Sequence, residues 1–286
     1  HESSRLEADR RLTTDKGALD KIEARQEFVR EMFHESARIE ANRSLDVRPS
    51  RTTKPYHQKT SYRTIKEMLE GLRPAECDYC WNVEDNTNSF SDRIFKSAEP
   101  WSQPYFDQIS KSHWSDDFIP KYVEVNFSNT CNFKCAYCGP EYSSKWMEEI
   151  NDYGPYYLAT FEYNGTRRMD ERNTRPYKHS DENPYVEAFW KWWPNLYPSL
   201  LNFRITGGEP LLHKDTFKVF DYVIDNPNPQ LKLAINSNLG APEKLYQQAK
   251  EKIKRISGEG LVREFILFTS CDGWGEQANY IRNGFD

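Results

Sequence analysis

The residues best suited to chemistry in this sequence are three closely spaced cysteines, Cys131, Cys135 and Cys138. Their C-x3-C-x2-C spacing places three thiolates on one short segment. Thiolates bind iron–sulfur clusters, and a [4Fe–4S] cluster takes four ligands. A loop that supplies three leaves one iron open for a small molecule, as in catalytic metal sites. The alternative is a zinc site whose fourth ligand is His213 or Cys271. We expect Cys271 to be a buried small hydrophobe rather than a ligand.

The elements that must position this loop follow an alternating order. Four short β-rich stretches are each followed by a segment with helical periodicity, and residues 151–183 form an irregular, aromatic insertion. Such alternation predicts an α/β fold with a parallel sheet. In these folds the chemistry lies at the carboxyl ends of the strands. The predicted strands are 122–127, 202–206, 231–236 and 264–270, and the predicted helices are 141–150, 186–193, 213–224, 242–256 and 276–282.

Polar and glycine-rich turns follow the second, third and fourth predicted strands. Glycine allows the backbone to approach a ligand closely, and exposed carbonyls there can accept hydrogen bonds from an ammonium group. Ordinary turns of these compositions are the alternative interpretation. The three turns contain Gly207, Gly208, Glu209 and Pro210; then Asn236, Ser237 and Asn238; and finally Ser270 and Asp272.

Together with the cysteine loop, these turns resemble the radical S-adenosylmethionine (SAM) superfamily over about residues 121–286. The resemblance implies that Tyr137 lies near the adenine of SAM, and that the GGEP turn (207–210) binds the SAM amino group through its backbone and Glu209. The turns at 236–238 and at Ser270 and Asp272 are implied to contact the rest of SAM. A guanidinium suits a carboxylate, so Arg282 is the candidate for the SAM carboxylate. Asn279 and Tyr280 depart from the His-Asp-x-x-Arg stretch of relatives, which leaves Arg282 as its supported residue.

The resemblance also implies a fold and an activity. The fold is a partial (βα) barrel, which usually has six units, so a chain with four predicted strands is expected to be incomplete. A [4Fe–4S] cluster and SAM are the implied cofactors, with an electron donor such as flavodoxin or ferredoxin. Reductive cleavage of SAM gives a radical that removes hydrogen from a substrate, for which a peptide or protein is the first expectation. A carbohydrate or nucleotide is the second, and a non-catalytic iron–sulfur or zinc module is the alternative from another class.

Residues 1–120 form an extension before this domain of residues 121–286. We predict surface helices within 1–46, a linker at 47–63, a short helix at 64–72 and loops over 82–120. The C-x2-C pair Cys77 and Cys80 resembles a segment of radical SAM proteins with twitch-type or SPASM-type extensions, which hold auxiliary clusters. Two thiolates need further ligands, for which His57 is a candidate. A zinc site and unligated thiols remain open alternatives.

The bulk composition excludes some partners. The formal net charge of −5 and the isoelectric point of about 5.8 argue against a binder of duplex nucleic acid. No apolar run of 18 residues or more predicts a membrane span, and the charged start of the chain is not a secretion signal. Clustered cysteines without such a signal favour metal binding in the reducing cytoplasm. The aromatic-rich segment 185–198 is predicted to pack on the sheet.

Overall fold

The computed structural model describes residues 63–64, 66–87, 89–116, 118–157, 162–163, 175–177 and 181–284. The chain divides into two compact units between Lys121 and Tyr122, and each unit is described by itself. The helices predicted within 1–46, the linker up to residue 62 and the candidate ligand His57 lie outside the described residues.

The second unit is built on a parallel sheet of four strands. Their order in the sheet is β1 (Tyr122–Asn126), β5 (Asn202–Thr206), β6 (Asn228–Ser237) and β7 (Val262–Thr269). Val123 lies opposite Phe203, which lies opposite Leu233, so the apolar residues of neighbouring strands share one face. The α/β fold with a parallel sheet is therefore confirmed, and the partial barrel stays a prediction.

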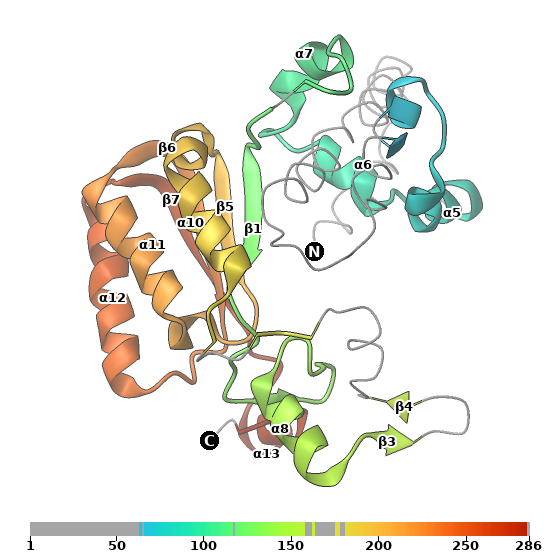
Figure 1. The fold of residues 1–286 in the computed structure, drawn as a ribbon. Coiled ribbons are helices and arrows are strands. Elements are labelled where there is room, and N and C mark those ends of the chain that lie inside the picture. Colours follow the sequence, from blue (N-terminus) through green and yellow to red (C-terminus); the bar gives the residue numbers. More distant parts are fainter. Residues whose placement is uncertain are drawn as a thin grey trace, which may run out of the picture. The chain divides into compact units, whose positions relative to one another are not determined.

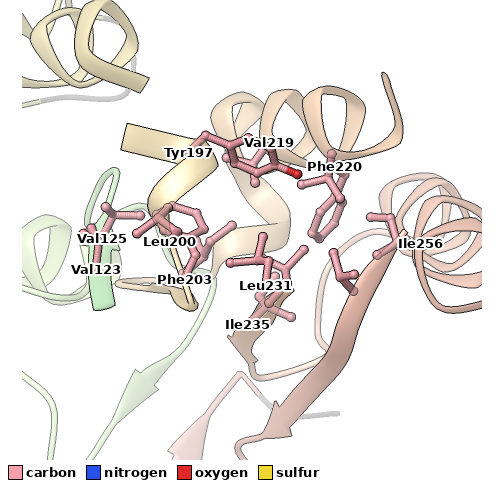
Figure 2. Packing of buried hydrophobic residues seen from close by; sticks show 14 of the residues in the cluster. Val123, Val125, Tyr197, Leu200, Phe203, Val219, Phe220, Leu231, Ile235 and Ile256 are labelled. Carbon is pink, nitrogen blue, oxygen red and sulfur yellow. The ribbon is translucent and has the colours of Figure 1, made fainter. Parts of the chain in front are cut away.

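Three helices cover the apolar face of this sheet (Figure 1): α10 (Pro184–Leu196), α11 (Lys214–Asp225) and α12 (Glu243–Gly258). Figure 2 shows how Phe203, Leu231 and Ile235 of the strands meet Phe220 and Ile256 of the helices. These five side chains are fully buried. Burial of each such side chain contributes roughly 1.5–3 kcal/mol, so this layer fixes the positions at which the strands end.

The helices begin where the sequence supplies a cap. Pro184 takes the first position of α10, where its missing N–H costs nothing, and the side chain of Asn183 accepts from the N–H of Tyr185 at 3.0 Å. The aromatic segment that follows packs Trp193 into the core with no exposure, as the sequence predicted. Within 151–183, the described residues include two short paired strands, β3 (Tyr156–Tyr157) and β4 (Glu162–Tyr163).

Two further elements lie beyond the strand ends. Helix α8 (Ser144–Tyr153) starts later than the predicted 141–150, because Ser143 caps it through the N–H of Trp146. Helix α13 (Gly275–Ile281) leads into β8 (Arg282–Asn283), which pairs antiparallel with β2 (Lys134–Cys135) of the cysteine loop. The strand arrows in Figure 1 point toward α8 and α13. The chain after β7 therefore returns to the loop after β1.

The described part of the first unit is more helical than its sequence predicted. Short helices occupy much of residues 75–110, and those from residue 82 onward lie where loops were expected: η1 (Ala75–Cys77), α5 (Asp78–Asn86), α6 (Asp92–Ser97), η2 (Gln103–Tyr105) and α7 (Phe106–Ser110). The prediction of loops over 82–120 was wrong there, because short helices such as α6 depend on tertiary contacts that no periodic pattern records. Arg93 of α6 is 2% exposed and pairs with Glu84 of α5.

None of the described helices is both long and apolar enough to cross a membrane.

Candidate functional site

The motifs predicted from the sequence converge at the carboxyl edge of the parallel sheet. The cysteine loop follows β1, the GGEP turn follows β5, residues 236–238 end β6, and Ser270 follows β7. In open α/β sheets this edge is where ligands bind. The tertiary structure thus gathers segments that lie up to about 150 residues apart in the chain.

Helix α8 and the loop's own amide groups hold the cysteine loop. The hydroxyl of Ser144 donates to the carbonyl of Cys131 and accepts from its N–H, both at 3.1 Å. The indole N–H of Trp146 donates to the carbonyl of Cys135 at 3.0 Å, and the hydroxyl of Ser143 donates to the carbonyl of Phe133 at 2.7 Å. These bonds anchor the backbone of the loop beside all but the last of its cysteines.

The three thiols form one neighbourhood. Cys131 and Cys135 are buried around Phe133, and the half-buried Cys138 packs against them. Burial raises the pKa of Cys131 to about 11 and raises the pKa values of Cys135 and Cys138. Neighbouring thiols add to the rise at Cys131 and Cys138, whereas Arg282 partly opposes it at Cys135. A raised pKa favours the protonated form of each thiol. A metal must displace these protons when it binds.

Polar hydrogens point at two of the sulfur atoms. The N–H of Phe133 donates to Sγ of Cys131 at 3.5 Å, and the side-chain amide of Asn238 lies 3.8 Å from the same sulfur. Nη1 of Arg282 donates to Sγ of Cys135 at 3.4 Å. Such donors stabilise sulfur as a thiolate, which is the form that binds iron. Three thiols in one place with donors on two of them fit the ligand set of an iron–sulfur cluster.

A single metal ion requires a different arrangement of ligands from a cluster. Within the described residues, no group of three or more His, Cys, Asp or Glu side chains is arranged to hold one ion. Ligands of one ion must converge on a point, whereas each thiolate of a [4Fe–4S] cluster binds a different iron. A loop without a single-ion site can therefore still bind a cluster.

The GGEP turn is locked onto the cysteine loop. The N–H of Gly208 donates to the carbonyl of Ser128 at 3.2 Å, and the N–H of Glu209 donates to that of Thr130 at 2.7 Å. A Cβ added to Gly208 would lie 2.2 Å from the Thr130 carbonyl oxygen. Gly207 has a φ of +116°, and a Cβ there would lie 2.2 Å from the Asn126 side chain. The close approach that glycine permits is thus made to the end of β1 and to the cysteine loop.

The buried side chain of Glu209 accepts hydrogen bonds from other residues of the chain at this edge of the sheet. Its carboxylate is 1% exposed and accepts from the N–H of Leu211 at 3.0 Å, the hydroxyl of Ser237 at 2.7 Å and the N–H of Asn238 at 2.6 Å. Burial raises the pKa of Glu209, and these donors partly oppose the rise. The carboxylate therefore joins η4 (Pro210–Leu212) to the end of β6. Its contact with a SAM amino group stays a prediction.

The two asparagines at the end of β6, Asn236 within it and Asn238 just after it, have different surroundings. Asn238 lies beside the cysteine loop, where its amide donates to the side chain of Asn132 at 3.1 Å, and Asn132 donates to the carbonyl of Gly240 at 2.8 Å. Asn236 instead accepts from Nε of Arg204 at 2.8 Å, on the sheet face opposite the helices. Asn132 was missed by sequence reasoning, although its position inside the C-x3-C spacing was the available signal.

The residues after β7 form a charged cluster with the loop. Tyr137 donates its hydroxyl to Oδ2 of Asp272 at 2.8 Å, and the same oxygen pairs with Nη2 of Arg282 at 2.7 Å. Ser270 contributes its backbone N–H to the carbonyl of Ser237 at 2.8 Å. Cys271 is exposed, so the prediction that it is a buried hydrophobe was wrong: it lies in the turn beyond β7 rather than under a covering helix.

The second cysteine pair belongs to the first unit. Cys77 ends η1 and is buried, and Cys80 lies in the first turn of α5. Burial raises the pKa of Cys77 to about 11, with Cys80 as the next cause. An auxiliary cluster on this pair stays a prediction.

Comparison with known proteins gives relatives for part of the chain. No family model matches the chain, and no solved structure matches it. Several curated proteins named GTP 3',8-cyclase do match. The protein of Sulfurimonas denitrificans is 26% identical over 144 residues, which are 50% of this chain and 35% of that protein. The protein of Campylobacter lari is 28% identical over 140 residues, 48% of this chain and 33% of that protein.

A third relative has the same name and a similar identity and coverage. The GTP 3',8-cyclase of Nautilia profundicola is 26% identical over 142 residues, 50% of this chain and 33% of that protein. The chain therefore spans about a third of the length of the curated relatives it matches. The three relatives carry the same enzyme name, and each matches about half of this chain.

Proposed function

We propose that this chain is the cluster-bearing part of a radical SAM enzyme, in which Cys131, Cys135 and Cys138 hold a [4Fe–4S] cluster. One observation carries the proposal: the three thiols lie together on a loop that the GGEP turn contacts directly, through the N–H groups of Gly208 and Glu209. A purely structural cluster needs no such turn, whereas a cluster that binds SAM needs backbone groups beside the open iron.

The chain's own residues prepare this site. When bound, the cluster supplies one electron that cleaves SAM to methionine and a 5′-deoxyadenosyl radical. Asn238 and Phe133 donate toward Cys131, and Arg282 donates toward Cys135, so the protein favours the thiolate form at two ligands. Tyr137, 62% exposed, is the loop's candidate for stacking on the adenine. Flavodoxin or ferredoxin is the class of electron donor we propose.

A nucleotide-derived small molecule is the substrate class that the observations favour. The relatives are named for a reaction of GTP. On the sheet face opposite α10, α11 and α12, the guanidinium of Arg204 lies 4.7 Å above the ring of Phe268, which is 42% exposed. A partly exposed aromatic side chain suits the flat base of a nucleotide, and the guanidinium beside it is paired with Glu124 at 3.7 Å. The peptidyl substrate predicted from the sequence has no comparable support.

The test compares two single cysteine variants after anaerobic reconstitution of the full chain with iron and sulfide. Cys135→Ala removes a proposed ligand, whereas Cys271→Ala removes an exposed thiol outside the loop and serves as the matched control. We expect the wild type and Cys271→Ala to bind about four irons at the loop and to release 5′-deoxyadenosine from SAM under strong reductant. Cys135→Ala should lose both the iron bound at the loop and the release of 5′-deoxyadenosine.

Two results would contradict the proposal. A wild-type chain that binds one zinc and no iron would favour the metal-module alternative. A wild-type chain that holds the cluster within its complete enzyme but forms no 5′-deoxyadenosine would leave an iron–sulfur protein without SAM chemistry.

A further inference from the structure

Arg282 contacts the cysteine loop although it lies 147 residues after Cys135 in the chain. Strand β8 pairs antiparallel with β2, and in that register Arg282 lies directly opposite Cys135. The N–H of Ala136 also donates to the carbonyl of Ile281 at 2.8 Å. Residues opposite each other in an antiparallel pair project their side chains from the same face. The backbone itself therefore places the guanidinium beside this thiol.

The side chain of Arg282 is held from two further sides. Nη2 pairs with Oδ2 of Asp272 at 2.7 Å, and the guanidinium carbon lies 5.3 Å from the centre of the Tyr137 ring. Tyr137 donates to the same oxygen of Asp272. The side chain of Arg282 is 8% exposed. A buried guanidinium with three fixed neighbours cannot swing freely to follow a ligand.

One donor of Arg282 remains unused. Its Nε is buried and has no hydrogen-bond partner within the described part of the chain. A buried N–H without an acceptor is costly, and native proteins rarely leave one unmatched. Nη1 of the same group already donates to Sγ of Cys135. A cluster held by Cys135 carries inorganic sulfides, which are acceptors of the kind that this N–H lacks.

We propose that Arg282 is a positioning residue that raises the reduction potential of the cluster through Cys135. This inference rests on the proposed function, because it needs the cluster. Reduction adds one negative charge to the cluster, and a nearby buried cation stabilises the reduced form more than the oxidised form. Hydrogen bonds to the sulfurs of a cluster are a recognised influence on its potential.

This role differs from the one that the resemblance implies for Arg282, which stays a prediction. Pairing with the SAM carboxylate would require its guanidinium to face SAM, whereas the structure directs Nη1 to a thiol and Nη2 to Asp272. Asp272 offsets part of the positive charge and fixes the geometry. The two roles separate in experiment, since one changes the cluster without SAM and the other changes the affinity for SAM.

The test is a redox titration of the reconstituted full chain, followed by electron paramagnetic resonance in the absence of SAM. Arg282→Gln removes the charge, Arg282→Lys keeps it, and Arg255→Gln is the control at an exposed arginine of α12. Iron content is measured first in every sample. For Arg282→Gln we expect the ratio of reduced to oxidised cluster at a fixed potential to fall about tenfold, a shift of about 59 mV for a one-electron couple.

The variants make the outcome specific. Arg282→Lys should recover most of the wild-type potential, and Arg255→Gln should match the wild type. An unchanged potential in Arg282→Gln with full iron content would overturn the inference and leave the proposed function intact. If that unchanged potential came with a weaker affinity for SAM, Arg282 would have the carboxylate role instead. A wild-type chain that binds no cluster would remove the proposed function, and this inference with it.

Discussion

Cys131, Cys135 and Cys138 lie on a loop that meets three other segments, whereas Cys77 and Cys80 lie on a continuous helical stretch of the other unit. N–H donors point at two of the loop sulfurs. Around the cysteine pair, the structure instead places a buried ion pair between Glu84 and Arg93. Both groups have close cysteine spacing, so spacing alone does not identify a cluster site. The surrounding donors distinguish the two.

The Glu84–Arg93 pair shows what organises the first unit. Nη2 of Arg93 lies 2.5 Å from Oε2 of Glu84, and its Nε donates to Oε1 at 3.0 Å. Arg93 also lies 4.0 Å from the centre of the Trp81 ring. The side chains of the ion pair are 1% and 9% exposed. This network joins α5 to α6 within about one helix turn of Cys80.

The largest expected effect separates the two cysteine groups directly. We expect Cys131→Ala to lose the loop-bound iron and all formation of 5′-deoxyadenosine, because each thiolate binds its own iron. The double variant Cys77→Ala, Cys80→Ala should keep the loop cluster and the cleavage of SAM. Iron analysis and product assay on the same reconstituted samples measure both. Iron beyond about four per chain in the wild type, lost in the double variant, would show that the pair also holds a cluster.

The next effect is on stability in the first unit. Glu84→Gln leaves the buried Arg93 without its counter-ion, which should lower the free energy of unfolding by about 3–5 kcal/mol. Arg73→Gln is the control: Arg73 pairs with Asp85 at the surface, and such pairs contribute about 0–1 kcal/mol. Urea unfolding followed by Trp fluorescence measures both variants. Equal effects of the two substitutions would show that the buried pair does not organise this region.

A smaller effect tests the lock between the GGEP turn and the cysteine loop. Gly208→Ala places a Cβ against the Thr130 carbonyl oxygen, so the loop must shift, at a cost of about 1–3 kcal/mol. The variant should also retain less iron after gel filtration. Gly258→Ala is the matched control, since a Cβ there meets no atom within 4 Å. If Gly208→Ala keeps its iron and its stability, the contact of the GGEP turn does not stabilise the cysteine loop.

The smallest effect concerns pH. The folded-state pKa of Glu209 is raised by burial, so its contribution to stability is full below the ordinary carboxyl pKa of about 4.3 and is lost as the pH rises through the folded value. On lowering the pH from about 7 to about 5, the wild type should therefore gain stability relative to Glu209→Gln. Thermal unfolding of both proteins across this range measures the difference. A constant difference would contradict the raised pKa.

The sequence predicted the frame of the second unit well. The strand predicted at 202–206 has the bounds of β5, and the predicted 213–224 helix differs from α11 by one residue at each end. Alternating apolar residues and local caps determine such elements within a few neighbouring positions. The order of the motifs along the chain also predicted that they share one edge, because the carboxyl ends of parallel strands lie together.

By itself, then, the sequence determined the α/β pattern, the three thiols of the loop and the turns that accompany them. Only the tertiary structure decided which donors meet which sulfur. Arg282 contacts Cys135 because β8 returns to β2, and Glu209 is held inside because β6 brings Ser237 to it. The tertiary structure also leaves Cys271 exposed, which the sequence did not predict. Contacts between residues so far apart in the chain depend on how strands pair and pack, and no local pattern of residue types records that pairing.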